Sequence, residues 1–149
     1  MDRAQLLKAS SVLALLVNAV VLVSLLLIGA LFSPSAIPIS VQLGALCLMF
    51  WARATLGLRS FHAAANPTAG GLVTSGPYHY IRHPIYTALC LLAWAGIAAQ
   101  WSTLAGVLGV VLLASVLARM ICEEKLLVQR YPEYRQYAAT TKRMVPFVY

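Results

Sequence analysis

Two long stretches of this sequence carry no charged residue, and they limit the fold more than any other feature. Residues 11–32 are long enough to cross about 30 Å of hydrocarbon as a single helix. Residues 85–118 are too long for one comfortable span, so they are expected to turn. Across the whole chain 61% of residues are hydrophobic and only 10% are charged, whereas soluble domains carry about a quarter charged residues. The sequence therefore predicts an integral membrane protein.

Turn signals divide the apolar part of the chain into four helices. Pro34 and Pro38 end the first stretch, and a polar turn at 100–102 divides the long one. We therefore predict an all-α, multi-pass transmembrane bundle of about four spans, formed as one domain over residues 1–149. The first span is too long for a signal-peptide core and is expected to remain as an uncleaved anchor. The predicted spans are residues 11–32, 39–58, 85–99 and 103–122, and an amphipathic tail follows over 123–149.

Charge is confined to one side of this predicted topology. All 11 Lys and Arg and all four acidic residues lie in residues 1–10, in 53–84 or after 118, and the turns at 33–38 and 100–102 carry none. The positive-inside rule predicts this distribution for an even number of spans. Both termini are thus expected in the cytoplasm, and the Ala- and Leu-rich chain favours a prokaryotic inner membrane. The net charge of +7 fits contact with anionic membrane lipids, and no basic stripe indicates nucleic-acid binding.

Neither the cysteines nor the histidines predict a metal or disulfide site. Cys47 and Cys90 lie in apolar runs, where a free thiol behaves as a small hydrophobe. His79 and His83 have a spacing that can bind zinc on a helix, but Pro84 follows directly and no third ligand is evident. No bound metal is therefore expected, and ordinary hydrogen-bonded histidines are favoured.

Polar residues gather in two segments that the predicted topology places on the same side of the membrane. The first is residues 72–86, and the second begins at Arg119 and continues into the tail. Arg119 and Glu123 share one face if the last helix continues, either as an arginine with a surface partner or as parts of a site. The glycines at 70, 71 and 76 are typical of turns, or of places where backbone amides approach an anion.

Two motifs in these segments resemble a known family of enzymes. The first is Leu72-Val73-Thr74-Ser75-Gly76-Pro77-Tyr78 with Arg82-His83-Pro84-x-Tyr86, and the second is Arg119, Glu123-Glu124, Leu126, Tyr134, Tyr137, Arg143 and Pro146. Over roughly residues 50–149 the chain resembles the isoprenylcysteine carboxyl methyltransferases and related membrane methyltransferases, which include the phospholipid N-methyltransferases. It departs from many members at Gly70-Gly71, where they carry a histidine.

The resemblance implies an enzyme that uses S-adenosylmethionine from a cytoplasmic-side pocket without a Rossmann domain. In that case Glu123 would hold the ammonium group of the cofactor and Arg119 would face the substrate, which makes them the candidate catalytic pair. A carboxylate beside an ammonium makes a strong charge-assisted hydrogen bond, and a guanidinium holds a carboxylate in a fixed orientation. By similarity, the residues that line the cofactor pocket would be Gly71, Leu72, Val73, Tyr78, His83, Pro84, Ile85 and Tyr86, together with Glu123.

Several functions stay open on the sequence alone. The first choice is carboxyl O-methylation of an isoprenylcysteine-like acid, and the nearest alternative is a phospholipid or small-amine N-methyltransferase. An amine would need a base, for which Glu124 or a histidine is the candidate. Further alternatives are an NADPH-dependent sterol-type reductase, which shares the Arg-His-Pro motif, and a non-enzymatic four-helix transporter, although no predicted span holds a charged residue at its middle.

The expected substrate is lipophilic and enters sideways from the bilayer, and no obligate protein partner is predicted. Arg82 either contacts a ligand or braces its loop against Glu124.

Overall fold

The described part of the chain is helical. The computed structural model describes residues 2–57 and 71–145, and within them the sole β-type pairing is an isolated parallel bridge between Ile81 and Lys142. This confirms the predicted all-α class. In chain order the elements are α1 (Arg3–Leu27), α2 (Ala36–Leu56), the 3₁₀ helix η2 (Gly76–His79), α3 (Pro84–Ala99), α4 (Thr103–Arg130) and α5 (Tyr134–Thr140).

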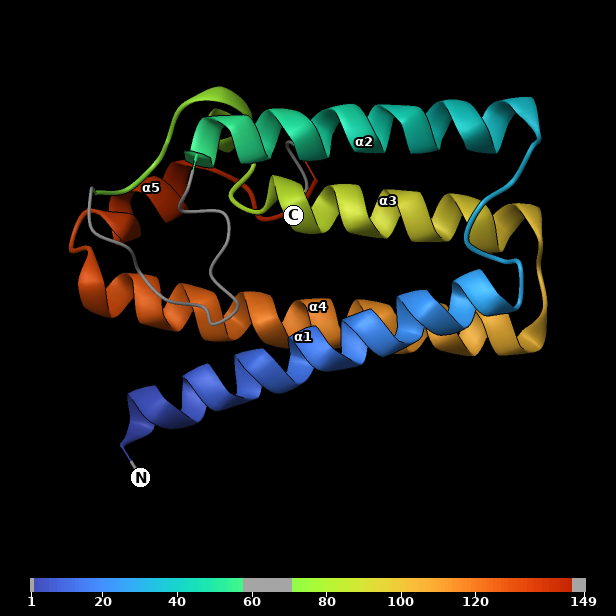
Figure 1. Ribbon diagram of the computed structural model, residues 1–149. Helices are drawn as coiled ribbons and strands as arrows, with labels where there is room; N and C mark the ends of the chain where they lie inside the picture. The colour runs from blue at the N-terminus through green and yellow to red at the C-terminus, as the bar shows by residue number, and fades with distance from the viewer. Residues whose placement is uncertain (1, 58–70, 146–149) are drawn as a thin grey trace.

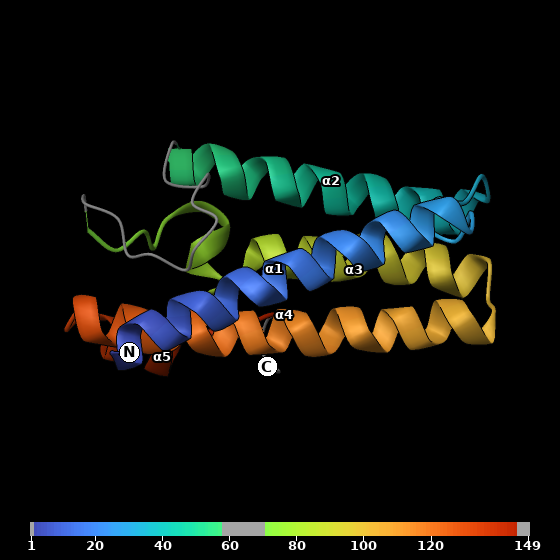
Figure 2. The same ribbon diagram turned by 60° about the horizontal axis from the view of Figure 1, so that its bottom comes forward.

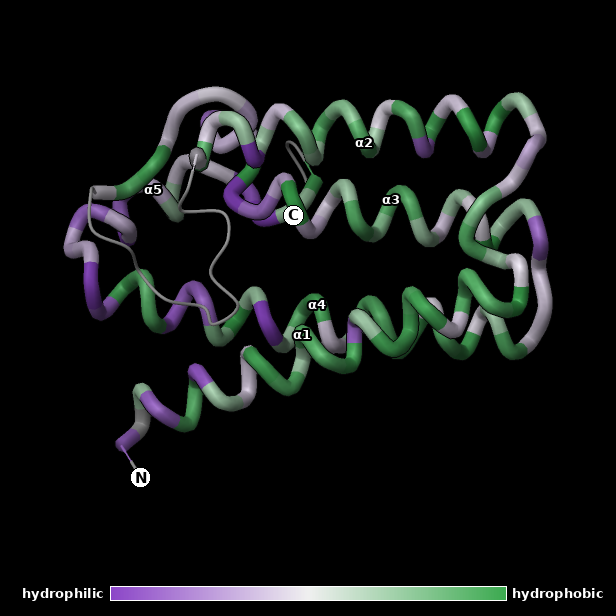
Figure 3. Tube along the Cα trace, in the orientation of Figure 1, coloured by the Kyte–Doolittle hydropathy of each residue, from purple (hydrophilic) through white to green (hydrophobic). Residues whose placement is uncertain are grey.

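Four long helices lie in two pairs (Figures 1 and 2). α2 packs beside α3 and α1 packs beside α4, while contact between α3 and α4 joins the pairs. The connections α1–α2 and α3–α4 lie together at one end of the bundle, and η2 and α5 lie at the opposite end. Figure 3 shows apolar residues along the helices and hydrophilic residues concentrated at the end that holds η2 and α5. The bundle therefore has one polar end, as the charge distribution predicted.

Three helices are long and apolar enough to cross a membrane: Ala4–Leu27, Ala36–Leu56 and Thr103–Arg130. α3 is also apolar but has only 16 residues, and it runs alongside α2 and α4 (Figure 1). The chain is thus a multi-pass membrane bundle in which a fourth crossing by α3 stays a prediction.

Several helix boundaries differ from the predicted spans: α1 begins at Arg3, eight residues early, and α2 begins at Ala36, three residues early. α1 ends at Leu27 instead of residue 32, because Gly29 takes a φ of 73° and Ala30 N donates back to Leu25 O at 2.8 Å. This closes the helix with the left-handed glycine that helix ends favour. α4 continues without a break past Cys122 to Arg130, so the first part of the predicted tail is helical.

Small residues and interhelical hydrogen bonds hold the helices together. Gly96 of α3 faces the backbone of the α1–α2 connection so closely that an added Cβ would lie 2.2 Å from the Leu31 carbonyl oxygen. Gln42 Nε2 of α2 donates to the same Leu31 carbonyl at 2.8 Å and to Leu92 O of α3 at 3.1 Å. On the other pair, Ser115 Oγ of α4 donates to Asn18 Oδ1 of α1. Such small and polar contacts are what drives helix association where lipid removes the hydrophobic gain.

Candidate functional site

The polar end brings side chains from α3, α4 and the tail into one cluster. Arg82 and His83 precede α3, which begins at Pro84 because proline needs no hydrogen-bond partner in the first turn. Glu123 and Glu124 come from the α4 extension, and Arg143 follows α5. The irregular backbone before α3 therefore lies against the last turns of α4, which places both predicted motifs in one site.

Glu124 is the centre of a dense ionic cluster. Its Oε1 accepts from Arg82 Nη2 at 2.9 Å and Nε at 3.1 Å, and Nε2 of His83 lies 3.2 Å away. Its Oε2 accepts from Arg143 Nη2 at 3.0 Å and Nε at 3.1 Å. Both carboxylate oxygens are thus occupied, and paired guanidinium contacts of this kind are among the strongest that proteins make. The geometry answers a question that the sequence left open, because Arg82 braces its segment against Glu124.

The same cluster fastens the segment that follows α5, which we call the strap (residues 141–144). Arg82 N donates to Lys142 O at 2.7 Å, and His83 N donates to Arg143 O at 2.9 Å. Thr87 Oγ1 donates to Met144 O at 2.8 Å, and Arg82 Nη1 donates to Thr141 O. The strap therefore crosses the start of α3 and is bonded to it along its length.

Tyr86 links the two predicted catalytic residues. Its hydroxyl donates to Glu123 Oε2 at 2.7 Å and accepts from Arg119 Nε at 2.8 Å. Arg119 is only 8% exposed and its Nη1 donates to the Ser11 carbonyl of α1 at 3.0 Å. Arg119 is thus a buried residue of the site, and in the described parts of the chain it meets Glu123 only through the Tyr86 hydroxyl.

The predicted cofactor residues fall into two neighbouring groups. His83, Pro84, Ile85 and Tyr86 lie at the start of α3 with Glu123 opposite, and the His83 ring stacks on the Tyr86 ring with centroids 5.5 Å apart. Leu72 and Val73 instead line a pocket of about 540 Å³, and the other residues that line it are Thr55, Leu56, Gly57, Thr74 and Ser75. Gly71 precedes this lining with a φ of 80°, a conformation that glycine adopts readily.

Tyr78 is the remaining predicted cofactor residue. It is buried in η2, which packs against α2, and its carbonyl accepts from Tyr137 Oη at 2.5 Å. Burial, with the nearby Glu123 carboxylate adding to it, raises the pKa of the Tyr78 phenol well above its ordinary value. The phenol therefore stays protonated and able to donate.

Some residues of the cluster were not predicted as site residues. Tyr134 of α5 is buried, and among the described residues its hydroxyl has no hydrogen-bond partner. Ser11, Thr87 and Thr141 take part through backbone or hydroxyl groups, for which a single sequence gives no signal. The glycine at position 70 lies outside the described residues.

Metal ligands do not gather in the described ranges. No group of three or more His, Cys, Asp or Glu residues there could hold a metal ion. His79 is exposed and contacts the Tyr80 ring, whereas His83 is buried against Glu124. The two histidines thus lie in different surroundings.

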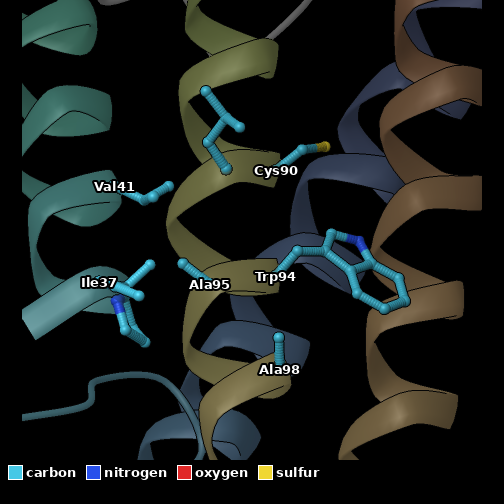
Figure 4. Close-up of a pocket in the computed structure, with 8 residues that line it drawn as sticks. Ile37, Val41, Cys90, Trp94, Ala95 and Ala98 are labelled. Carbon is cyan, nitrogen blue, oxygen red and sulfur yellow. The ribbon is translucent and has the colours of Figure 1, made fainter. Parts of the chain in front are cut away.

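A second hollow lies at the other end of α3. Figure 4 shows Ile37 and Val41 of α2 on one side and Trp94 on the other, with Ala95 and Ala98 of α3 between them. Its volume is about 350 Å³, and it is lined almost wholly by apolar side chains. It holds none of the charged residues of the polar end.

Comparison with known proteins identifies the family of the chain. The family described as Phospholipid methyltransferase matches residues 35–134, which run from the start of α2 through α4 to Tyr134. The chain is 40% identical over 78 residues to the cobalt-zinc-cadmium resistance protein CzcN of Cupriavidus metallidurans. That alignment covers 50% of this chain but only 35% of the relative. No solved structure matches the chain. Because the family match spans about two thirds of the chain, including the first polar segment and the beginning of the second, the chain belongs to the phospholipid methyltransferase family.

Proposed function

We propose that this protein is an S-adenosylmethionine-dependent methyltransferase that acts on a lipophilic acceptor at the membrane. The observation that carries the proposal is the contrast between two neighbouring carboxylates. Glu124 is saturated by Arg82, His83 and Arg143, whereas Glu123 is half-buried and, among the described residues, accepts a hydrogen bond from Tyr86 alone. Glu123 therefore has acceptor capacity left for a ligand.

The residues around Glu123 fit the polar end of this cofactor. A carboxylate with free lone pairs suits an ammonium group, and the Tyr134 hydroxyl is a buried polar group that lacks a partner in the described residues. When bound, the cofactor supplies a methyl group already activated on a sulfonium. The protein then has mainly to hold the acceptor in line with that methyl group and to exclude water.

Arg119 favours an acceptor with an anionic group. Its Nε and Nη1 are engaged by Tyr86 and Ser11, while its Nη2 donates to no other residue that the structure describes. A guanidinium edge in a buried position suits a carboxylate or phosphate. Carboxyl O-methylation of an isoprenylcysteine-like acid fits this arrangement, because a carboxylate is ionised at neutral pH and needs no base.

N-methylation of a phospholipid headgroup is the second candidate, and the family match favours it. In this case Arg119 would hold the phosphate, and the amine would have to lose a proton. Glu124 is a poor base for that step, because two guanidinium groups stabilise its charged form. The proton would have to leave through Glu123 or to water.

Calorimetric titration of the detergent-purified chain with S-adenosylmethionine tests the proposal. The parent should bind, Glu123→Gln should weaken binding at least tenfold, and the exposed acid variant Glu133→Gln should match the parent. A folded parent that binds NADPH instead would establish the reductase alternative. A parent that binds neither ligand would leave transport or another non-enzymatic role.

Transfer of a labelled methyl group separates the two acceptor classes. The chain is supplied with labelled S-adenosylmethionine and either a prenylated cysteine or phosphatidylethanolamine in mixed micelles. A methyl ester releases its label as methanol in base, whereas a methylated amine does not. Arg119→Gln should abolish transfer to either acceptor while leaving cofactor binding intact, since the residue is proposed to face the acceptor.

A further inference from the structure

We propose that Glu124 is a positioning residue that controls cofactor affinity by holding the strap closed over the start of α3. This inference rests on the proposed function and extends it beyond the residues that touch ligand. Neither the resemblance nor the family match assigns Glu124 a role in holding the strap, and the family match ends at residue 134, before the strap begins.

Glu124 joins three segments of the chain. Arg82 comes from before α3, Arg143 from the strap, and Glu124 itself from α4. The strap is also held to α3 by the Thr87 hydroxyl, to Arg82 through the carbonyl of Thr141, and to α4 by the buried Met144 side chain, which packs with Val116 and Met120. Loss of the Glu124 carboxylate therefore removes the anionic partner of both guanidinium groups and loosens the strap.

A chain of contacts leads from Glu124 to the proposed ligand site. Nε2 of His83 lies 3.2 Å from Glu124 Oε1, and the His83 ring stacks on Tyr86. Tyr86 in turn donates to Glu123 Oε2 at 2.7 Å. His83 is also tied to the strap, because its backbone N–H donates to Arg143 O. Glu124 thus fixes the ring that orients Tyr86 toward Glu123.

Closure of the strap and binding of the cofactor are energetically coupled in this proposal. If only the closed strap presents Tyr86 and Glu123 correctly, the apparent dissociation constant equals the intrinsic one divided by the closed fraction. Loss of the Glu124 contacts therefore raises the apparent dissociation constant for the cofactor, whereas saturating cofactor restores the closed form. By reciprocity, the cofactor must then stabilise the closed strap.

The experiment compares Glu124→Gln with the parent and with Glu133→Gln in two measurements. Calorimetry gives the dissociation constant for S-adenosylmethionine, and limited trypsin digestion gives the rate of cleavage after Lys142, followed by mass spectrometry of the released peptide. We expect Glu124→Gln to raise both the constant and the cleavage rate at least tenfold, with kcat at saturating cofactor within threefold of the parent. Cofactor should slow the cleavage of the parent.

A double variant tests whether Glu124 affects cofactor affinity through the strap. Glu124→Gln combined with Arg143→Gln should bind the cofactor no more weakly than Glu124→Gln alone, since both substitutions remove the same ion pair between Glu124 and Arg143. If Glu124→Gln fails to fold, Arg143→Gln replaces it, because the Arg143 side chain is 35% exposed and its loss disturbs the fold less. The dissociation constant and the cleavage rate should then both rise, but by less than in Glu124→Gln.

Three outcomes would overturn the inference. One is an opened strap with unchanged cofactor affinity. Another is lost affinity with a strap that stays protected, which would make Glu124 a direct ligand. The third is a parent that binds no cofactor, which would overturn the proposed function as well, whereas the first two leave that function standing.

Discussion

Substitution of Tyr86 by phenylalanine is expected to destabilise the folded chain markedly, because one hydroxyl group serves two charged residues. The hydroxyl lies 2.8 Å from Arg119 Nε and 2.7 Å from Glu123 Oε2. Phenylalanine keeps the ring and its stacking on His83 but removes both hydrogen bonds. The change therefore isolates the polar contribution of the site from its packing.

The expected loss can be worked from the surroundings of the two partners. A hydrogen bond to a charged group contributes about 1.5–3 kcal/mol, so the upper limit for both is about 6 kcal/mol. Glu123 is half-buried and can regain water, and Arg119, one turn away on α4, can approach Glu123 directly. These compensations bring the expected loss in free energy of unfolding to about 2–3 kcal/mol, which is a change of roughly 30- to 150-fold in the unfolding equilibrium constant.

Equilibrium unfolding in mixed micelles, with a rising fraction of SDS and tryptophan fluorescence as the signal, would measure this loss. Tyr80→Phe is the matched control, because Tyr80 is 58% exposed and its hydroxyl is not within the cluster. The control should lie within about 0.5 kcal/mol of the parent. A Tyr86→Phe variant as stable as this control would refute the reasoning, since it would show that Arg119 and Glu123 do not depend on the hydroxyl.

Three further predictions concern packing, helix association and pH. Gly96→Ala should cost about 3 kcal/mol in the same unfolding assay, since its Cβ meets backbone, whereas Gly44→Ala, with open space around it, should be neutral or slightly stabilising. Ser115→Ala should cost about 0.6 kcal/mol through loss of the bond to Asn18, and Ser24→Ala, whose hydroxyl bonds within its own helix, should cost less; equal losses would contradict an interhelical role. Burial raises the pKa of Tyr137 from 10.0 to about 12, against a smaller lowering by Arg82, so stability should be unaffected below pH 10 and should fall as the pH rises from 10 to about 12. The difference in absorbance between the parent and Tyr137→Phe should place the ionisation of Tyr137 near pH 12. A midpoint near 10 would contradict the burial of the hydroxyl that donates to the Tyr78 carbonyl.

The fold followed from the sequence because apolar length and turn residues act locally. Pro34 and the turn at 100–102 lie between the helices that the structure shows, whereas Pro38 lies in the first turn of α2, which begins at Ala36. The end of α1 was predicted five residues late, because residues 28–32 are as apolar as the helix before them. Only the reversed backbone at Gly29 and the contact of Leu31 with Gln42 make this segment leave the helix.

The candidate site was predicted in part. The spacing of Arg119 and Glu123 was visible in the sequence, but the hydroxyl of Tyr86 between them depends on how α3 packs against α4. Spacing alone could not distinguish Glu123 from Glu124, which only the family resemblance separated, since neighbours on a helix point about 100° apart and their partners come from distant segments. The strap was missed for the same reason, because its bonds run from backbone groups whose partners lie about 60 residues away.

The short length of α3 has a consequence for where chemistry meets the membrane. Its 16 residues rise about 24 Å, which is about 6 Å less than the hydrocarbon thickness of a typical bilayer. If the turn at 100–102 sits at the far surface, with Trp101 exposed there, the Tyr86 end of α3 lies about one helical turn below the near surface. α4 has 28 residues, which rise about 42 Å and exceed the hydrocarbon thickness, so its carboxylates are anchored on a helix long enough to pass this depth. An amphiphile can therefore reach the polar end while its tail stays in lipid, and a thinner bilayer brings that end closer to water.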